Sequence, residues 1–275
     1  MKDMKLTFIG GGNMASSLIG GLVTDHFNPG HISISDKLES RREDLAARFG
    51  VSTSEDNITA AEGANVVVLA VKPQQLREVA EGLAPIIQQG RPLVVSIAAG
   101  VRSSDIEQWL GGNIAVVRTM PNTPALVQTG ATALYANPRV TEDQRDMAES
   151  IMRAVGLTLW VDDEALLDAV TALSGSGPAY FFRIMEALET AGVELGLSRE
   201  AAHLLTLQTA LGAAKMALES EESIATLRKR VTSPGGTTEQ GLQVMNENNI
   251  DRLFSEVLKA ARDRSAELAK IFSES

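Results

Sequence analysis

Short apolar runs alternate with amphipathic segments of helical length over residues 5–120. The run Val66–Val71 is continuously apolar and rich in β-branched residues, which is typical of a parallel strand covered on both faces. Segments such as Leu38–Phe49 and Gln74–Gln88 carry apolar residues at helical spacing. This alternation predicts an α/β fold with a doubly wound parallel sheet. Strands are expected at Lys5–Ile9, His31–Ser35, Val66–Val71, Leu93–Ile97 and Ile114–Thr119.

The pattern changes at the acidic triplet Asp162-Asp163-Glu164. Before the triplet, residues 129–161 predict two further strands on either side of a helix at Glu142–Val155. After it, only helical segments follow. We therefore predict a Rossmann-type domain over residues 1–162 and an all-helical domain over residues 163–275.

One helix of the second domain is too apolar to face solvent. The segment Arg199–Glu219 is apolar on most of its faces, and such a helix is normally buried. A small helical domain has little interior of its own, so we expect the interface of a homodimer to cover this segment. Another helix is expected to begin at Ser176, which suits the N-cap, with Pro178 in its first turn.

The stretch Leu6–Ala15 carries the first functional motif. Its apolar run ends in three glycines and passes directly into a helix-compatible segment. Gly10, Gly12 and Ala15 match the G-x-G-x-x-G/A spacing of a dinucleotide-binding turn. The unpaired N–H groups at the helix start would then bind a pyrophosphate. A turn without a ligand is the structural alternative.

The loop after the second predicted strand bears on the choice of dinucleotide. Asp36 stands near the usual distance from the glycines for a carboxylate that binds ribose hydroxyls, which favours NAD because a carboxylate repels a 2′-phosphate. Lys37, Arg41 and Arg42 favour NADP instead. Both cofactors, and a plain solvated turn, stay open at this point.

Three other loops follow predicted strands and would lie at the ligand-binding edge of the sheet. Val71-Lys72-Pro73 is fixed by its proline, Ala98-Ala99-Gly100 is small enough for close ligand approach, and Met120–Pro124 is made rigid by two prolines. Each of them also fits a turn without a ligand.

A second motif, Ser233-Pro234-Gly235-Gly236-Thr237-Thr238, lies in the helical domain. Thr237 with Gln240 three residues later fits a capping box at a helix start. The glycines allow consecutive N–H groups to form an anion-binding nest in front of that helix. The density of hydroxyls and glycines favours a carboxylate or phosphate site over a merely flexible loop.

Composition narrows the class of function. The net charge of −10 argues against nonspecific nucleic-acid binding and against adhesion to anionic membranes. The chain has no cysteine and only three scattered histidines, so we expect no disulfide and no metal site. We find no apolar run long enough to span a membrane and no signal peptide, and we expect a cytoplasmic protein.

With the glycine turn, Val71–Pro73, Met120–Pro124, Ser174–Tyr180 and Ser233–Thr238 in this order, the chain resembles the pyrroline-5-carboxylate reductase family over nearly its whole length. The resemblance implies NADPH- or NADH-dependent reduction of Δ1-pyrroline-5-carboxylate to L-proline, the last step of proline biosynthesis. It also implies an N-terminal Rossmann domain, a C-terminal helical dimerisation domain, and dimers that assemble further, commonly into decamers.

The resemblance also carries binding residues onto this chain. Those implied to contact the cofactor are Ile9, Gly10, Gly11, Gly12, Asn13, Met14, Ser35, Asp36, Asn57, Ala70, Val71, Lys72, Pro73, Ala98 and Ala99. Those implied to contact the substrate are Glu164, Ser233, Gly235, Gly236, Thr237 and Thr238, with Thr238 as the catalytic residue near the ring nitrogen. For Glu164, a solvated linker stays open as the alternative.

Two positions depart from the family pattern. The family often has Asn-Arg where this chain has Asp36-Lys37, which leaves the preference for NADPH in doubt. Some members have an asparagine where this chain has Arg230, so no role is transferred to that position.

The implied chemistry needs no strong acid in the chain. A cyclic imine is basic enough to arrive partly protonated, so Thr238 or a bound water would suffice to hold or relay the proton. A related imine or β-hydroxyacid dehydrogenase is one alternative, but it would place a lysine or aspartate on the helical domain, and Lys215 has no evident partner there. A non-catalytic dinucleotide-binding protein is the other alternative.

Overall fold

The computed structural model describes residues 4–274 of the chain. They fold as two compact units, of which the first contains the chain up to Ser176 together with the chain from Ala260 onward, and the second contains Gly177–Lys259. This division differs from the predicted domains 1–162 and 163–275. The residues after position 162 continue to pack with the first unit, and the C-terminal segment returns to it.

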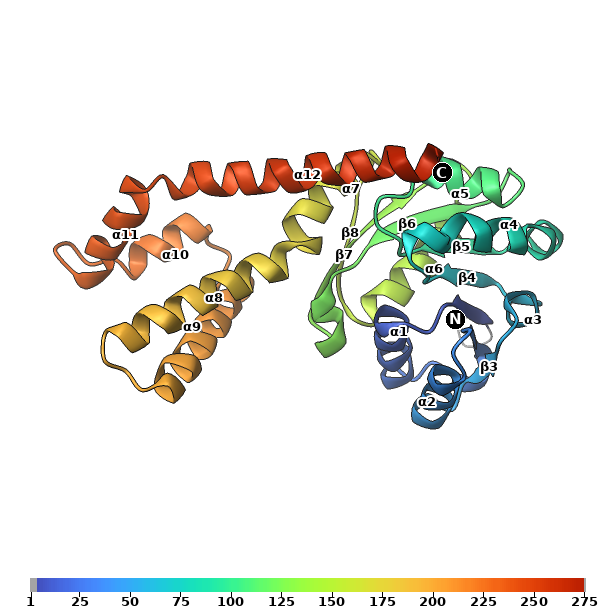
Figure 1. Ribbon diagram of the computed structural model, residues 1–275, viewed down its shortest axis with the longest axis horizontal. Helices are drawn as coiled ribbons and strands as arrows, with labels where there is room; N and C mark the ends of the chain where they lie inside the picture. Colours follow the sequence, from blue (N-terminus) through green and yellow to red (C-terminus); the bar gives the residue numbers. More distant parts are fainter. Residues whose placement is uncertain (1–3, 275) are drawn as a thin grey trace. The chain divides into compact units, whose positions relative to one another are not determined.

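An eight-stranded sheet forms the centre of the first unit in the described part of the chain (Figure 1). The strand order is β3-β2-β1-β4-β5-β6-β7-β8, and of these neighbours β6 and β7 are antiparallel. The order 3-2-1-4-5-6 of the first six strands is the doubly wound Rossmann arrangement, so the predicted fold class is confirmed. The strands are β1 (Leu6–Ile9), β2 (Ile32–Ser35), β3 (Ser52–Ser54), β4 (Val66–Leu69), β5 (Leu93–Ser96), β6 (Val116–Met120), β7 (Gly130–Ala136) and β8 (Gly156–Trp160).

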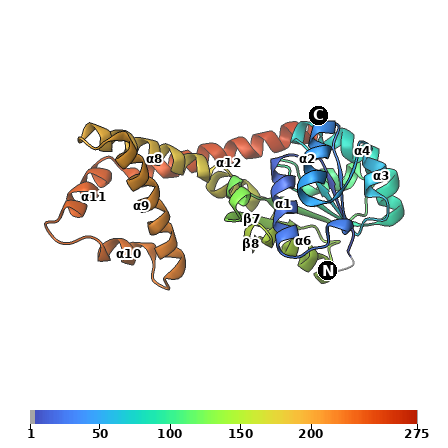
Figure 2. The same ribbon diagram turned by 90° about the horizontal axis from the view of Figure 1, so that it is seen from below.

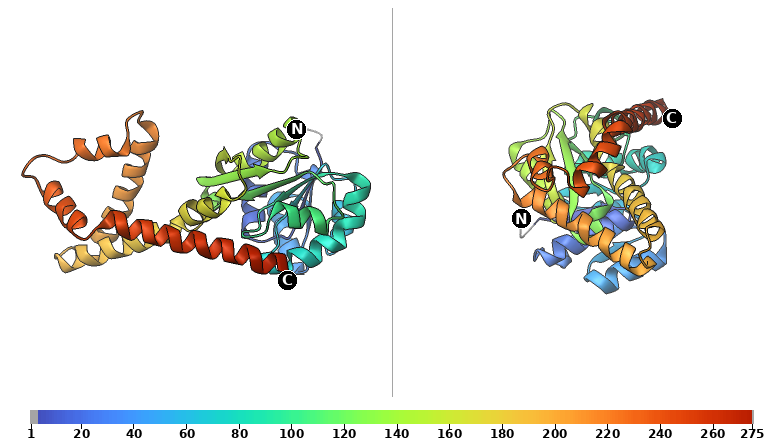
Figure 3. Two further views of the ribbon diagram at one scale, coloured as in Figure 1. Left: turned by 90° about the horizontal axis from the view of Figure 1, so that it is seen from above. Right: turned by 90° about the vertical axis from the view of Figure 1, so that its left-hand side faces the viewer.

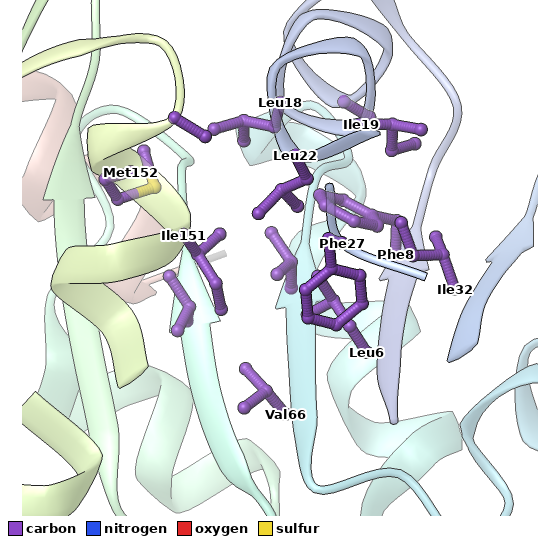
Figure 4. Close-up of a cluster of buried hydrophobic side chains, with 14 of the residues drawn as sticks. Leu6, Phe8, Leu18, Ile19, Leu22, Phe27, Ile32, Val66, Ile151 and Met152 are labelled. Atoms are coloured by element: carbon purple, nitrogen blue, oxygen red, sulfur yellow. The ribbon is translucent and has the colours of Figure 1, made fainter. Parts of the chain in front are cut away.

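Each face of the sheet has its own hydrophobic core, because successive strand residues point to opposite faces. On one face, Leu18 and Leu22 of α1 and Ile151 of α6 lie against Leu6 and Val66 of the strands (Figure 4). That face is covered by α1 (Asn13–Thr24), α2 (Glu39–Phe49) and α6 (Glu142–Arg153), and the other by α3 (Asn57–Ala61), α4 (Pro73–Gly90) and α5 (Ser103–Trp109). Short 3-10 helices lie at Pro29–His31 and Thr123–Val127.

The helical path from the first unit into the second has no N-cap at Ser176. It begins as α7 (Leu166–Val170), widens into a π-helical turn at Thr171–Gly175 and continues as α8 (Gly177–Glu194). Ser176 itself has helical dihedral angles, φ −86° and ψ −19°, rather than the extended angles of an N-cap. The predicted helix start at Ser176 is therefore wrong, because the chain is already helical when it reaches the serine.

The second unit contains α8, α9 (Arg199–Glu219), α10 (Ile224–Arg230) and α11 (Thr237–Glu247). The loop at residues 195–198 joins α8 to α9 (Figure 2). Within the single chain α9 is not buried as an apolar helix should be. Among its residues only Ala202 is buried, and its leucines at 204, 207, 211 and 218 are exposed.

The last helix, α12 (Ile250–Glu274), belongs to both units (Figure 3). Its first residues lie in the second unit, and from Ala260 onward it packs with the first. There the hydroxyl of Ser265 donates to Asp168 Oδ1 at 2.8 Å, and the hydroxyl of Ser273 donates to Asp105 Oδ1 at 3.1 Å. Phe272 packs against the core of the α4–α5 face. Across the described residues, no helix combines the length and hydropathy of a membrane span.

Candidate active site

The turn between β1 and α1 lies at the point where the strand order reverses. Gly10 adopts φ +100°, and a Cβ atom there would come within 2.6 Å of the Ala70 carbonyl oxygen. Its N–H donates to the carbonyl of Ser35 at 2.8 Å, and the N–H of Ala70 donates to the carbonyl of Ile9 at 2.8 Å. The turns after β1, β2 and β4 are therefore tied together, and only glycine fits at position 10.

The start of α1 presents unpaired donors to open space. Gly12 is the N-cap, with φ −70° and ψ −177°, and no side chain bonds to this helix start. A Cβ atom built on Gly12 meets nothing within 4 Å. The N–H groups of Asn13 and Met14 thus have neither an intrahelical partner nor a cap. A helix start of this kind fits the pyrophosphate of a dinucleotide.

Asp36 follows β2 directly and is fixed against the glycine turn. Its Oδ2 accepts the N–H of Gly11 at 2.9 Å, and its Oδ1 accepts the N–H of Leu38 at 2.9 Å. Burial raises the pKa of this carboxyl, but the hydrogen bonds from Leu38 and Gly11 and the guanidinium of Arg41 outweigh burial and hold the pKa below its ordinary value. Beside it, the Ser35 hydroxyl is buried and has no hydrogen-bond partner among the described residues.

The other residues predicted to contact the cofactor lie on neighbouring loops at the same edge of the sheet. Asn57 is the first residue of α3, whose N-cap Asp56 accepts the N–H of Thr59 at 2.7 Å. Lys72 is the exposed N-cap of α4, and Pro73 is its first residue. Ala98 follows β5 and donates its N–H to Ser96 Oγ at 3.3 Å. The structure places these loops together, and their cofactor contacts stay predictions.

Glu164 is neither solvated nor part of a linker. Its carboxylate accepts the N–H of Ser103 at 2.7 Å and the Ser103 hydroxyl at 2.9 Å. It also pairs with Arg118 Nη1 at 3.1 Å. The side chain of Glu164 is 16% exposed and that of Arg118 is 2% exposed. The linker interpretation is therefore wrong, whereas a contact between Glu164 and substrate stays a prediction.

The partners of Glu164 are not among the site residues predicted from the sequence. Arg118 lies on β6 with its Nε buried and unpartnered in the described part of the chain. Next to it, Arg102 Nη2 pairs with Asp168 Oδ2 at 2.6 Å, and Ser265 bonds to the same carboxylate. Arginine within the apolar run Ile114–Thr119 was the available signal, since a cation in a buried strand requires a buried partner.

The Ser233–Thr238 loop belongs to the second unit and runs from the connection between α10 and α11 into the first two residues of α11. Gly235 adopts φ +70°, and a Cβ atom on Gly236 would lie 2.9 Å from the Ser233 carbonyl oxygen. Ser233, Thr237 and Thr238 are exposed. A hollow of about 430 Å³ is lined by residues of α10 and α11, among them Arg228 and Glu239, and by Thr232. None of the residues that line it belongs to Ser233–Thr238.

The predicted capping box of Thr237 and Gln240 is wrong. Gly236 is the N-cap of α11, with φ −85° and ψ 170°, and Thr237 is the first helical residue. Glu239 instead reaches back, and its Oε2 accepts the N–H of Gly235 at 2.8 Å. Because Gly236 rather than Thr237 is the N-cap, the third helical residue, whose side chain can reach back, is Glu239 rather than Gln240.

The sheet order, the glycine turn and the open helix start define a Rossmann-type dinucleotide-binding protein. Comparison with known proteins narrows this class. Residues 5–100 match the family described as NADP oxidoreductase coenzyme F420-dependent, and residues 164–268 match pyrroline-5-carboxylate reductase dimerisation.

Full-length relatives agree with these matches. The pyrroline-5-carboxylate reductase of Pseudomonas aeruginosa is 51% identical over 98% of this chain and 98% of its own length. The solved structure of that enzyme from Coxiella burnetii has a TM-score of 0.94 and 49% identity, covering 97% of this chain and 99% of the other. That of Plasmodium falciparum pyrroline carboxylate reductase, with NADP bound, has a TM-score of 0.86 and 28% identity, covering 98% and 99%. The chain belongs to the pyrroline-5-carboxylate reductase family.

Proposed function

We propose that this protein reduces Δ1-pyrroline-5-carboxylate to L-proline with NADH or NADPH, as the last step of proline biosynthesis. The observation that carries the proposal is the 51% identity, over 98% of the chain, to an enzyme with that name. The glycine turn supplies the physical support, because its open helix start suits the pyrophosphate of the hydride donor.

The dinucleotide, when bound, supplies the hydride. In this proposal, Gly10–Met14 hold its pyrophosphate, Ser35, Asp36 and Asn57 face the adenosine ribose, and the loops after β4 and β5 line the nicotinamide. The residues on those two loops are Ala70, Val71, Lys72, Pro73, Ala98 and Ala99. The rigid ties between the turns after β1, β2 and β4 favour this assignment, because they fix the whole binding edge before any ligand arrives.

The substrate carboxylate is proposed to bind the Ser233–Thr238 loop, where hydroxyls and N–H groups surround the start of α11. Two donors of that loop are already used, because the N–H of Gly235 donates to Glu239 and the N–H of Gly236 donates to the Ser233 carbonyl at 3.0 Å. The carboxylate would therefore rely on Ser233, Thr237 and Thr238, which are exposed. The hydroxyl of Thr238 is proposed to hold the ring nitrogen and its proton, and Glu164 is proposed as a further substrate contact.

We also propose a cytoplasmic homodimer that can assemble further, for example into a decamer. The support is the exposed apolar surface of α8 and α9, which includes Phe181, Phe182 and Leu211 at 64%, 65% and 62% exposure. These helices lie within the residues that match the dimerisation family. Burying such a surface against a second copy removes it from water.

The proposed reaction is tested by following the oxidation of NADH and NADPH by the purified protein with pyrroline-5-carboxylate, with a 2-keto acid, or with neither. We expect turnover with pyrroline-5-carboxylate alone. Turnover of the keto acid would identify a hydroxyacid dehydrogenase instead, and binding of cofactor without turnover of either compound would identify a non-catalytic protein.

Thr238 is tested by two substitutions. Thr238→Ala should lower kcat/KM for pyrroline-5-carboxylate about 10- to 100-fold, because the imine loses a hydrogen-bond partner. Thr238→Ser retains the hydroxyl and should keep most of the activity. Equal activity of the alanine variant and the wild type would exclude the proposed contact with the ring nitrogen.

A further inference from the structure

The carboxylate of Asp36 is held rigidly beside the turn that would bind the dinucleotide. Both of its oxygens accept backbone N–H groups, from Gly11 at 2.9 Å and from Leu38 at 2.9 Å. The side chain is 8% exposed. A Cβ atom on Gly11 would lie 3.4 Å from Asp36 Oδ2, so the carboxylate touches the glycine turn itself. It cannot swing away from a ribose bound there without breaking these bonds.

Two of the three basic residues of this segment are engaged with the protein, whereas Lys37 is exposed. Arg42 donates from Nη1 to the carbonyl oxygens of Asp36 at 2.8 Å and Lys37 at 3.2 Å, and its side chain is 16% exposed. Arg41 Nη1 lies 3.3 Å from Asp36 Oδ2. These two guanidiniums would have to hold a 2′-phosphate. One is tied to the loop backbone and the other to Asp36.

The neighbouring strand adds further negative charge. The N–H of Asp36 donates to the carbonyl of Ser54 at 3.2 Å, and Ser54 is followed by Glu55 and Asp56. Glu55 lies 4.0 Å from Arg42 Nη2, so it offsets that cation as well. The edge of the sheet that would receive the 2′ position therefore combines a fixed carboxylate with two guanidiniums that already have acidic partners.

We propose that Asp36 makes this protein select NADH over NADPH. This inference rests on the proposed reductase function and names the cofactor that it uses. The carboxylate accepts hydrogen bonds from the 2′- and 3′-hydroxyls of the adenosine ribose, and it repels a 2′-phosphate because the two anions would lie side by side at a partly buried site. Asp36 thus acts as a specificity-determining residue.

Binding to the full-length protein tests the proposal without any substrate. Isothermal titration calorimetry should show that NADH binds at least about tenfold more tightly than NADPH at moderate salt. Asp36→Asn removes the charge and keeps one acceptor oxygen, so it can accept only one of the N–H groups of Gly11 and Leu38. It should bring the two affinities to within about threefold of each other, chiefly by strengthening the binding of NADPH.

A matched variant controls for net charge. Asp44 lies on α2 and pairs with Arg48 at 3.0 Å, and its side chain is 55% exposed. Asp44→Asn removes the same charge from the same region and should leave the ratio of affinities at its wild-type value. Thermal unfolding without ligand verifies that both variants are folded.

Two outcomes would overturn the proposal: NADPH binding as tightly as NADH to the wild type, or an unchanged ratio in Asp36→Asn. The reductase assay is a separate measurement. If the affinity ratio behaves as expected but pyrroline-5-carboxylate is not reduced, the proposed function fails while the role of Asp36 in dinucleotide selection stands.

Discussion

Arg118 is a cation in the interior of the sheet, and its partner comes from outside the strands. It lies on β6 with its side chain 2% exposed and pairs with Glu164 at 3.1 Å. Burial lowers the pKa of Arg118, and the charge of Glu164 partly restores it. Because Glu164 also binds the N–H and hydroxyl of Ser103, one carboxylate fastens β6, α5 and the start of α7 together.

Removing only one member of this pair should cost more than removing both. Glu164→Gln leaves Arg118 buried without a counter-charge and should lower the free energy of unfolding by about 2–3 kcal/mol. The double variant Arg118→Met, Glu164→Gln should recover a large part of that loss. Urea denaturation measures both values.

The same Glu164→Gln protein also tests the proposed substrate contact. At a temperature where the variant is folded, a raised KM for pyrroline-5-carboxylate would support the contact. A KM equal to that of the wild type would assign Glu164 to structure alone.

The carboxyl of Asp36 should make the free energy of unfolding depend on pH in the acidic range. Burial raises its pKa, but the bonds from Leu38 and Gly11 and the charge of Arg41 bring the pKa below 3.8 in the folded protein. The unfolded chain therefore takes up this proton first as the pH falls. The stabilisation is complete above about pH 5 and is lost as the pH falls through the lowered pKa.

Asp36→Asn should therefore lower the free energy of unfolding by about 1 kcal/mol at pH 6, after allowance for solvent screening, and by progressively less towards pH 3. Urea denaturation at pH 6, 4.5 and 3 measures this difference. A difference that stays constant across this range would contradict the lowered pKa.

Two glycines of the β1–α1 turn have different roles: Gly10 is required by the fold, and Gly12 leaves room for a ligand. At Gly10 a Cβ atom would clash with the Ala70 carbonyl oxygen, so Gly10→Ala should destabilise the fold. At Gly12 the added methyl group meets open space and the φ of −70° suits any residue. Gly12→Ala should therefore cost no more than about 1 kcal/mol of stability, yet lower the affinity for NADH at least about tenfold by filling the pyrophosphate position.

Gly82 provides the control for this pair. It lies inside α4, and a Cβ atom there also meets nothing within 4 Å. Gly82→Ala should stabilise the protein by about 0.5–1 kcal/mol and leave cofactor affinity unchanged. Titration calorimetry and thermal unfolding distinguish the three variants, and normal NADH binding by Gly12→Ala would exclude the assigned position of the pyrophosphate.

Elements with a strong hydrophobic pattern were predictable, and those without one were not. The buried strands and long helices were found with ends displaced by a few residues, as with Val66–Val71, which ends at Leu69 as β4. The strand Ser52–Ser54 and helix Asn57–Ala61 were missed, since the strand is polar and largely exposed and the helix has a single turn.

Some features of the candidate site were likewise predictable from the sequence, and others were not. The glycine turn can be predicted from the sequence because its backbone geometry requires glycine at fixed spacing. The partners of Glu164 cannot be predicted in this way, because Ser103, Arg118 and Glu164 are far apart in the chain and meet only through the fold. The side chain that accepts a backbone N–H in front of α11 belongs to Glu239 rather than to Gln240, because the N-cap is Gly236 rather than Thr237. The sequence pattern does not distinguish two N-cap positions that differ by one residue.

For the protein as a whole, the exposed leucines of α9 predict association. Leu211 is 62% exposed in the single chain, and residues 204, 207, 211 and 218 recur at helical spacing along one face. Leu211→Glu should raise the dissociation constant of the dimer at least about tenfold, because it forces a charge into an apolar interface.

Sedimentation velocity over a range of concentrations measures this shift. Leu157→Glu is the matched control, since Leu157 is 68% exposed but lies outside residues 164–268, which match the dimerisation family. It should sediment like the wild type. If Leu211→Glu also sedimented like the wild type, α9 would not form the interface.

The return of α12 to the first unit has a consequence for how the protein is made. A ribosome releases the chain from the N-terminus, so the sheet strands emerge long before Ser265 and Phe272, which complete contacts in the same unit. Until the codons for Ser265 and Phe272 are read, Asp168 lacks its serine partner and the α4–α5 face lacks the ring of Phe272. A stop codon before Ser265 therefore damages the part of the protein that was synthesised first. A message that encodes residues 1–176 alone specifies an unfinished first unit.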